Sequence, residues 1–312
     1  MRVLLAGGIG FIGSHVTVEL LKIGHEAIIV DNLVNSHIEV LDNIFKLTSK
    51  KPIFYNIDLT KEFNIEEEID IVIHLAGLKS VADSITRSLE YYQTNLTITF
   101  NLLNFMERKN INKLIFSSSA TVYGNAEIPI TTRSITGSGI ANPYGKTKYF
   151  IEEILRDYCV SRKQMQTICL RYFNPIGNLP FLTENPKSKP NNIVPVILRA
   201  IKENAVLKVF GNDYKTRDGT AVRDYIHVVD LANCHCQSLD KFKEGFQSFN
   251  VGTGKGTSVM ELIELFDKNG VSVKYEIVDR RQGDLPEVYC IPDDFKTTKT
   301  VEDAVKDVIN SL

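Results

Sequence analysis

A tyrosine and a lysine four residues apart are the residues of this chain whose types and spacing could do chemistry. Tyr144 and Lys148 lie in the segment NPYGKTK, residues 142–148, which should become helical after Pro143 and place both side chains on one helix face. A phenol with its ordinary pKa near ~10 is a poor base at neutral pH, but a nearby ammonium group stabilises its anion. Tyr144 could then remove the proton of a substrate hydroxyl while another group takes the hydride. The same spacing is common in surface helices, so this interpretation depends on the rest of the chain.

A run of serines upstream offers a hydroxyl to the same chemistry. The sequence SSSATVYG, residues 117–124, follows an apolar run of strand character at residues 113–116. Serines at the carboxyl end of a strand could simply cap the next helix. Together with Tyr144 and Lys148 a second interpretation is better, in which Ser119 hydrogen-bonds the substrate oxygen that Tyr144 deprotonates. These three side chains are the predicted catalytic residues.

A glycine-rich turn near the N-terminus supplies a second functional pattern. Residues 2–6 (RVLLA) are an apolar run of strand length, and a helical pattern follows through Leu21. Between them, Gly7, Gly10 and Gly13 allow a tight turn, close approach of a pyrophosphate to the backbone, and close packing of the helix on the strand. The positive end of the helix dipole then faces the phosphates. The pattern predicts a dinucleotide site.

An acidic residue follows at the expected distance. The next expected strand, residues 26–30, ends at Asp31, which lies 18 residues past Gly13 and close to the ~20 typical of a carboxylate that bonds the adenosine ribose. The same carboxylate would repel a 2'-phosphate, which favours NAD over NADP. The alternative is a tight turn with a capping acid.

Strand and helix patterns then alternate through the first half of the chain. Helices are expected at 37–47 and 89–109, and strands at 52–56, 69–75 and 113–116. The run IDIVIHL at 69–75 is continuously apolar, as in a strand buried on both faces of a parallel sheet. The pattern predicts an α/β fold, a doubly wound parallel sheet (Rossmann-like) with ligands at the carboxyl ends of its strands.

The second half reads differently. From about Phe173 the sequence is irregular and rich in proline and glycine, which suits a smaller C-terminal substrate-binding lobe and not another parallel-sheet unit. The predicted domains are residues 1–172, which bind NAD, and residues 173–312, a nucleotide-sugar-binding lobe partly intertwined with the first.

Two further motifs are interpreted as structural. The run GTGKGT at 252–257 lacks the spacing of a nucleoside-triphosphate loop, and it lies between an expected strand and a helix from Ser258, so it predicts a helix-entry loop. The run Cys-His-Cys at 234–236 has no second ligand pair at zinc spacing and falls in an amphipathic helical pattern, so no metal site is predicted.

Composition bounds the remaining possibilities. The chain has 312 residues, 43% apolar and 24% charged, and a net charge of -2, which gives no reason to expect nucleic acid or an anionic membrane as a partner. No apolar run reaches the ~18 residues that span a bilayer. Five cysteines without a disulfide-scaffold pattern suit a reducing cytoplasm.

The glycine turn, the serine run and the Tyr144/Lys148 pair resemble the extended short-chain dehydrogenase/reductase family. Other stretches are closer to its nucleotide-sugar epimerase branch and cover nearly the whole chain: AGLK at 76–79, LEYY at 89–92, RYFNP at 171–175, FGNDY at 210–214, DGTAVRDYIHV at 218–228 and RRQGDLP at 280–286.

The resemblance implies a role for each member of two residue sets. Besides Tyr144 and Lys148, it implies cofactor contacts from Gly7, Gly10, Phe11, Ile12, Gly13, Asp31, Asn32, Asn35, Asp58, Leu59, Ala76, Gly77, Lys79, Asn95, Ser117 and Tyr172. It implies substrate contacts from Ser119, Asn174, Asn191, Asn192, Arg223, Arg281, Asp284 and Val288. It also implies bound NAD, a UDP-sugar substrate and a homodimer formed through the two long helices.

The activity implied is interconversion of UDP-glucose and UDP-galactose by transient oxidation at C4. A rival is a nucleotide-sugar 4,6-dehydratase, but such relatives carry an acidic pair just after the active-site hydroxyl, where this chain has Ala120 and Thr121. A second rival is a nucleotide-sensing regulator without catalysis, against which the intact catalytic set argues.

This chain departs from the family pattern at two places. Ala6 stands where a threonine usually precedes the first glycine. The tail after Cys290 is short, and the chain has no tryptophan, whereas relatives place a helical turn and a tryptophan there. These departures bear on the packing of the lobe and on dimerisation, and they spare the predicted catalytic residues.

One position bears on substrate breadth. In the family, the residue four places after the aspartate of Arg-x-Gly-Asp lies beside the C2 substituent of the sugar, and a tyrosine there excludes an N-acetyl group. Here that position is Val288, which is small, so UDP-N-acetylglucosamine is also an expected substrate. The alternative is that the short tail shifts the segment and brings Glu287 or Tyr289 to the pocket wall.

Overall fold

A parallel sheet forms the centre of the computed structural model, which describes residues 1–184, 192–281 and 283–312. The sheet has seven strands in the order β10-β6-β5-β4-β1-β2-β3, and every neighbouring pair is parallel. Its strands are β1 (Arg2–Ala6), β2 (Glu26–Asp31), β3 (Ile53–Asn56), β4 (Ile71–His74), β5 (Lys113–Ser119), β6 (Gln166–Tyr172) and β10 (Gly245–Val251). The predicted doubly wound parallel sheet is confirmed.

Apolar residues on both faces explain why the strands read as continuous hydrophobic runs. In β1, Val3 and Leu5 belong to the core cluster on one face of the sheet, and Leu4 and Ala6 belong to the cluster on the other. All four are fully buried. A strand covered on both faces gains from apolar side chains at every position, so period-two alternation disappears.

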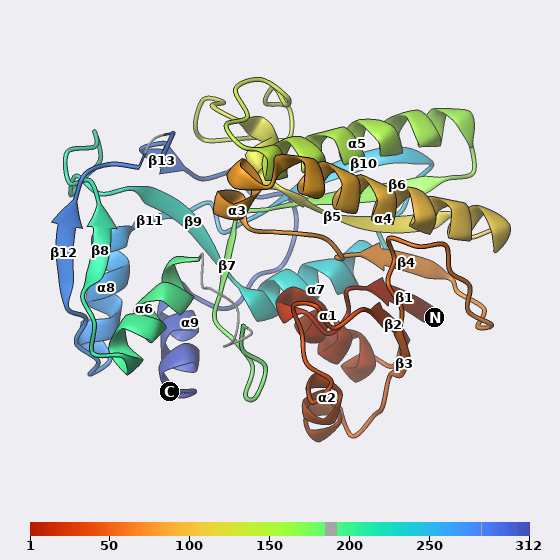
Figure 1. Ribbon diagram of the computed structural model, residues 1–312, viewed down its shortest axis with the longest axis horizontal. Helices are drawn as coiled ribbons and strands as arrows, with labels where there is room; N and C mark the ends of the chain where they lie inside the picture. Colours follow the sequence, from red (N-terminus) through yellow and green to blue (C-terminus); the bar gives the residue numbers. More distant parts are fainter. Residues whose placement is uncertain (185–191, 282) are drawn as a thin grey trace.

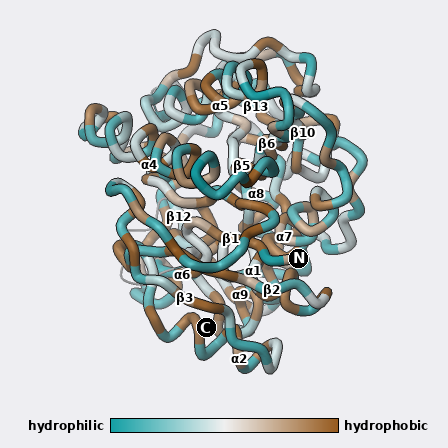
Figure 2. Tube along the Cα trace, turned by 90° about the vertical axis from the view of Figure 1, so that its right-hand side faces the viewer, coloured by the Kyte–Doolittle hydropathy of each residue, from teal (hydrophilic) through white to brown (hydrophobic). Residues whose placement is uncertain are grey.

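Helices cover both faces of the sheet (Figure 1). The first face carries α1 (Phe11–Lys22), α2 (Val40–Thr48) and α7 (Val228–Ser238), and the second carries α3 (Val81–Thr86), α4 (Ser88–Arg108) and α5 (Pro143–Ser161). Figure 2 shows hydrophobic and hydrophilic residues alternating along the surface helices such as α4, as expected of a helix with one buried side. The boundaries differ from those expected by up to three residues; α2, for example, begins at Val40.

One expectation about the second half is wrong. Its residues do add a parallel-sheet unit, because β10 pairs along its whole length with β6 and α7 precedes it on the first face. A strand was expected over residues 248–251, but its place in the central sheet was not, because β10 lies at the sheet edge, where five of its seven residues are only partly buried and polar and aromatic side chains are mixed. The division of the chain at residues 172 and 173 stays a prediction.

The remaining elements form a smaller lobe beside the sheet (Figure 1). They are β7 (Asn174–Ile176), α6 (Ile193–Lys202), β8 (Leu207–Phe210), β9 (Val222–His227), β11 (Gly256–Ser258), α8 (Val259–Lys268), β12 (Tyr275–Val278), β13 (Glu287–Val288) and α9 (Val301–Ile309). Helices α6, α8 and α9 share one apolar core with β8. The GTGKGT run leads through β11 into α8, where Ser258 forms a capping box with Glu261, so the predicted helix-entry loop is confirmed.

The short tail is fastened to the rest of the chain. The carboxylate of Asp230 accepts hydrogen bonds from the backbone N–H groups of Thr298 and Lys299, at 2.9 and 2.8 Å. Helix α9 then buries Val305 in the lobe core. Over the part of the chain that the structure describes, no helix has both the length and the apolar character that crossing a bilayer requires.

Candidate active site

A cleft of about 340 Å³ opens at the carboxyl ends of the central strands. Its walls come from the β1–α1 turn, the ends of β2, β4, β5 and β6, the start of α5, and the first residues of the lobe. Such a position, outside the strand ends of an open parallel sheet, is where this class of fold binds ligands. The size is within the range of small-molecule sites.

The glycine turn has the geometry of a phosphate cradle. Gly7 has a φ of +82°, which favours glycine, and a Cβ on Gly13 would lie 2.1 Å from the carbonyl oxygen of Gly7. Gly10, by contrast, has room for a Cβ within the protein, since its nearest neighbour is 3.5 Å away. Gly10 is the N-cap of α1 and lines the cleft, so its missing side chain leaves space for a ligand at the helix N-terminus. The residues present therefore fit a dinucleotide.

Asp31 faces the cleft at the end of β2. Its Oδ1 accepts hydrogen bonds from the backbone N–H of Leu33 at 3.0 Å and from the hydroxyl of Ser36 at 2.9 Å. These bonds fix the carboxylate where a ribose could reach it. The same carboxylate also stabilises the turn after β2, which is the capping role that was the alternative prediction for Asp31.

The structure brings together the three predicted catalytic side chains. Ser119 ends β5 and Tyr144 and Lys148 lie in the first turns of α5, which Asn142 caps by accepting from the N–H of Gly145 at 2.8 Å. The Tyr144 hydroxyl bonds to Ser119, and the Lys148 ammonium lies 5.8 Å from the centre of the Tyr144 ring. All three line the cleft.

The capping role of Ser119 is present in the structure, and its contact with a substrate oxygen stays a prediction. Its Oγ accepts from the backbone N–H of Thr121 at 3.2 Å and so caps the short 3-10 helix η1 (Ala120–Tyr123). The Thr121 hydroxyl also donates to it, at 2.9 Å. Thr121 lines the cleft and was missed by sequence reasoning, although the run SSSAT that contains it was a usable signal.

The pKa of Tyr144 is raised in the structure, and the lowering of this pKa by Lys148 stays a prediction. Burial raises the pKa of Tyr144 to about 12, and the hydrogen bond from Ser119 only partly opposes this. Burial also lowers the pKa of Lys148 to about 8. Both shifts have one cause, since a low-dielectric site disfavours every charged form.

The segment AGLK, residues 76–79, lines the cleft, but Asn95 lies one layer behind it. The Asn95 side chain bonds the N–H and the carbonyl oxygen of Leu78 at 2.8 and 3.1 Å, and the hydroxyl of Thr147 at 3.1 Å. It therefore positions the loop and does not line the cleft. Lys79 reaches Glu184 across the cleft in an ion pair of 3.0 Å.

Tyr172 lines the cleft and connects it to the Cys-His-Cys run. Its hydroxyl lies 2.5 Å from Nε2 of His235, whose Nδ1 bonds the carbonyl oxygen of Leu231 at 2.9 Å. Because the carbonyl oxygen of Leu231 can only accept, Nδ1 of His235 must carry the hydrogen. Nε2 is then the acceptor, and the Tyr172 hydroxyl donates to it. His235 is fully buried in α7 and serves the structure there.

The predicted site residues fall into two groups. The structure brings to the cleft Gly7, Gly10, Phe11, Ile12, Gly13, Asp31, Asn32, Asn35, Leu59, Ala76, Gly77, Lys79, Ser117, Ser119, Tyr144, Lys148, Tyr172, Asn174 and Asn192. Those that do not line it are Asp58, Asn95, Arg223, Arg281, Asp284 and Val288. Asn191 lies outside the described residues. Asp58 instead bonds Thr60 in the turn after β3.

Two arginines share one carboxylate in the lobe. Arg223 on β9 and Arg281 each lie 3.2 Å from Asp284. The Arg281 guanidinium also stacks 4.6 Å from the ring centre of Phe210. Two positive charges against one negative charge leave this cluster able to attract an anion. Sequence reasoning also missed Glu184 and Phe173 as lining residues. Phe173 lies in the RYFNP stretch, which was a usable signal, whereas the irregular composition around Glu184 held none.

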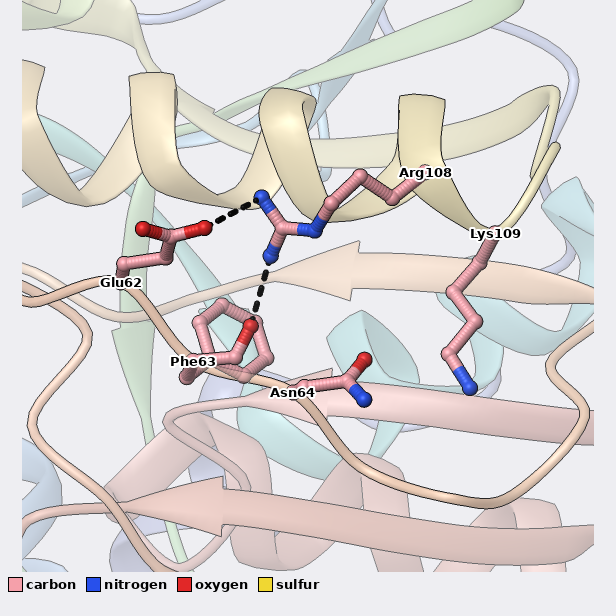
Figure 3. Close-up of a pocket in the computed structure, with 5 residues that line it drawn as sticks. All are labelled: Glu62, Phe63, Asn64, Arg108 and Lys109. Atoms are coloured by element: carbon pink, nitrogen blue, oxygen red, sulfur yellow. Dashed lines mark hydrogen bonds and ion pairs between the residues drawn. The ribbon is translucent and has the colours of Figure 1, made fainter.

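A second hollow lies on the surface where the end of α4 faces the segment after β3, lined by Glu62, Phe63, Asn64, Arg108 and Lys109 (Figure 3). Arg108 spans it, and its guanidinium bonds Glu62 at 3.1 Å and the carbonyl oxygen of Phe63 at 2.7 Å. The hollow therefore presents no free guanidinium, and its position is remote from the catalytic set.

The glycine cradle, the acid at the end of β2 and the Ser119–Tyr144–Lys148 set define an enzyme of the short-chain dehydrogenase/reductase class. Residues 3–252 match the NAD dependent epimerase/dehydratase family, and the chain belongs to that family. The expected NAD-dependent epimerase class is thereby confirmed.

Individual relatives are similar over nearly the whole chain. The chain is 45% identical to the UDP-glucose 4-epimerase of Bacillus subtilis (strain 168), over 94% of this chain and 89% of that protein. It is 43% identical to the UDP-glucose 4-epimerase of Yersinia enterocolitica, over 94% and 90%. Among solved structures, the UDP-glucose 4-epimerase of Bifidobacterium longum in complex with NAD+ and UDP superposes with a TM-score of 0.93 at 40% identity, over 99% and 97%.

The first prediction concerns the phenol. Tyr144→Phe should keep the fold and the bound dinucleotide and lose at least about a hundredfold in turnover of UDP-galactose, because the proton acceptor is gone. Turnover, thermal midpoint and bound nucleotide are measured together on parent and variant. A rate within tenfold of the parent would remove Tyr144 from this role.

The second prediction concerns Asp31. Nucleotide released from the purified protein should be NAD and not NADP, because a 2'-phosphate would meet the fixed carboxylate. The matched variant Asp31→Asn keeps the shape of the side chain and removes its charge. The ratio of the dissociation constant for NADP to that for NAD should therefore decrease about tenfold, equivalent to about 1.4 kcal/mol. Recovery of mainly NADP from the parent would sink this assignment.

Proposed function

We propose that the protein is a UDP-glucose 4-epimerase that interconverts UDP-galactose and UDP-glucose with bound NAD. The observation that carries the proposal is the Ser119–Tyr144–Lys148 set at the inner end of a cleft that continues to the glycine cradle. The similarity over 94% of the chain to proteins of that name supports it.

In this proposal the chain holds the cofactor with three parts of the cleft. The N–H groups of the glycine turn face the diphosphate, Asp31 bonds the adenosine ribose, and Lys148 bonds the nicotinamide ribose. NAD bound there accepts a hydride from a sugar carbon and returns it. The positive end of α1 and the fixed carboxylate act without reorganisation, which suits a cofactor that stays bound through the reaction.

Tyr144 and Ser119 handle the proton. As phenolate, Tyr144 takes the proton of the sugar O4 hydroxyl when C4 is oxidised, and it returns the same proton when C4 is reduced. Ser119 hydrogen-bonds the O4 oxygen throughout, supported by the Thr121 hydroxyl. Inversion at C4 requires the 4-keto sugar to present its other face, so the sugar must be held loosely and the nucleotide firmly.

The firm contacts belong to the nucleotide half of the substrate. Arg223 and Arg281 are suited to the diphosphate because guanidinium forks bond phosphate oxygens in pairs. Asp284 is proposed to bond the uridine ribose, and Asn174, Asn191 and Asn192 complete the substrate contacts. Firm binding of these remote groups leaves the sugar free to turn.

A 4,6-dehydratase is the second candidate within the same family. Elimination of water across C5 and C6 requires an acid near Ser119, and the next residues are Ala120 and Thr121. A catalytically silent nucleotide sensor is the third candidate, and a complete catalytic set speaks against it.

A homodimer in a reducing cytoplasm completes the proposal. Large apolar side chains are exposed on α3, α4 and α5, among them Ile85 at 63%, Leu89 at 73% and Phe150 at 43%. Burial of this surface against a second copy would remove apolar area from water. The five cysteines are free thiols, as expected of a reducing compartment.

Incubation of the purified protein with UDP-galactose tests the proposed function. UDP-glucose should accumulate to a constant ratio that is also reached from UDP-glucose, without added NAD. Formation of a 4-keto-6-deoxy sugar would indicate the dehydratase, and binding of UDP-galactose without product would indicate the sensor.

Substrate breadth is proposed to depend on Val288. Its side chain packs against a buried cluster that contains Val122, Ile130 and Phe173, and Phe173 lines the cleft. Adjacent residues of a strand face opposite sides, and the ring of Tyr289 lies toward Gly256, where an added Cβ would meet it at 3.4 Å. This geometry favours Val288 over its two neighbours as the residue nearest the sugar.

The third prediction is that UDP-N-acetylglucosamine is also epimerised, since valine lacks the ring that would exclude the N-acetyl group. In Val288→Tyr, kcat/KM for the N-acetyl sugar should fall at least about tenfold while that for UDP-galactose changes little. The two sugars are compared in parent and variant. No turnover of the N-acetyl sugar by the parent would end the idea, and equal losses for both sugars would show that Val288 is not the gate.

A further inference from the structure

A fully buried ion pair lies behind the catalytic set, outside the residues discussed so far. Glu152 of α5 and Arg171 of β6 are 1% and 2% exposed. Nε and Nη2 of Arg171 donate to the two oxygens of Glu152 at 3.0 and 2.6 Å, and the Ser118 hydroxyl donates to the first oxygen at 2.5 Å. The third arginine donor, Nη1, bonds the Tyr123 hydroxyl at 2.8 Å.

Stability alone is a poor reason for this pair. Moving two charges out of water costs several kcal/mol per ion, and well-packed apolar residues of similar volume often do as well. The surroundings here are apolar and could accept such residues, since Phe116, Ile151 and Leu155 belong to the core on the same face. A different role for the charges should therefore be sought in their position.

Their position continues the spacing of the catalytic residues. Tyr144, Lys148 and Glu152 follow one another at intervals of four on α5, so they share a helix face. Arg171 lies beyond Glu152 on β6. With Tyr144 as phenolate, the order along this face is negative, positive, negative and positive, and each charge has an opposite neighbour.

The groups around Lys148 make Glu152 its counter-ion. His74 of β4 and Cys169 of β6 both face Lys148. Burial lowers the pKa of His74 to about 3 and raises the pKa of the Cys169 thiol, so both side chains are uncharged at neutral pH. Tyr144, on its own helix, has its pKa raised to about 12 and is faced in turn by Tyr91 of α4. Burial lowers the pKa of Lys148, and Cys169 and Glu152 act in the opposite direction and raise it. Of these two groups, Glu152 carries a formal negative charge.

We infer that Glu152 is a positioning residue for the reaction, whose carboxylate, held by Arg171 and Ser118, keeps the buried Lys148 charged. A charged Lys148 is the form that can stabilise the Tyr144 phenolate and bond a ribose hydroxyl. This inference rests on the proposed function for its consequence in turnover. The electrostatic relation between Glu152 and Lys148 is a property of the chain alone, so it can be measured without turnover.

The experiment follows the charge of Lys148 directly. Protein labelled with carbon-13 at the lysine Cε is titrated by NMR, and the resonance missing from Lys148→Met identifies the group. In the isosteric variant Glu152→Gln, the midpoint of Lys148 should fall by about one pH unit, because an attractive charge is removed. Glu152→Asp keeps the charge and should stay closer to the parent.

Tyr123→Phe is the matched control. It removes a hydroxyl from the same buried network without changing any charge, so it should leave the Lys148 midpoint in place. Should Glu152→Gln fail to fold with Arg171 unpaired, Glu152→Gln combined with Arg171→Met removes the whole pair. Because Glu152 lies one helical turn from Lys148 and Arg171 lies beyond it, loss of the nearer negative charge should dominate, and the Lys148 midpoint should still fall, by less than in Glu152→Gln. An unchanged midpoint in either folded charge-removing variant, or an equal change in Tyr123→Phe, would overturn the inference.

Activity gives an independent reading. The high-pH limb of the kcat profile should move to lower pH in Glu152→Gln along with the NMR midpoint, whereas a merely structural role would lower kcat at every pH. A parent without epimerase activity would refute the proposed function and leave the NMR result standing. A shifted midpoint with an unshifted kcat limb would show that Glu152 does not act on the reaction through Lys148.

Discussion

The hydrogen bond from the Lys148 ammonium to the carbonyl oxygen of Ser117, at 2.7 Å, is the contact on which the site depends. It joins α5 to the end of β5 across 31 residues of sequence and is fully buried. Because the acceptor is backbone, the bond fixes the helix against the strand itself. One turn before Lys148, Tyr144 then meets Ser119, two residues past the acceptor. Asn95 holds the same helix from the other side through Thr147.

The burial of this contact also disfavours the charged forms of the catalytic side chains. The same exclusion of water raises the pKa of Tyr144 and lowers that of Lys148, because it disfavours the charged form of each side chain. Preorganised charges act strongly in such a site because little water screens them. The Glu152–Arg171 ion pair behind α5 supplies charges that are fixed in this way.

Local patterns predicted what lies close in sequence. The glycine turn, Asp31 and the Tyr144/Lys148 spacing each sit on one element or one turn, and the structure brings all of them to the cleft. Asn95 and Asp58 do not line the cleft, and sequence cannot distinguish a residue one layer behind a cleft from one that lines it. Glu184 and the Glu152–Arg171 pair depend on residues far apart in the chain, and no spacing rule connects them. The pairing of the edge strand β10 with β6 was not predicted, because the two strands are far apart in the chain and the composition of β10 is mixed.

The place of β10 has a consequence for the order in which the protein is made. The sheet that begins at Arg2 is complete only when Val251 has been added, since β10 covers the edge of β6. A nascent chain that has emerged only to Tyr172 exposes that edge, with unpaired N–H and carbonyl groups along seven residues. Covering that edge therefore requires about eighty further residues, and such long-range pairing is slow. Until β10 is in place, the edge of β6 can pair with other chains.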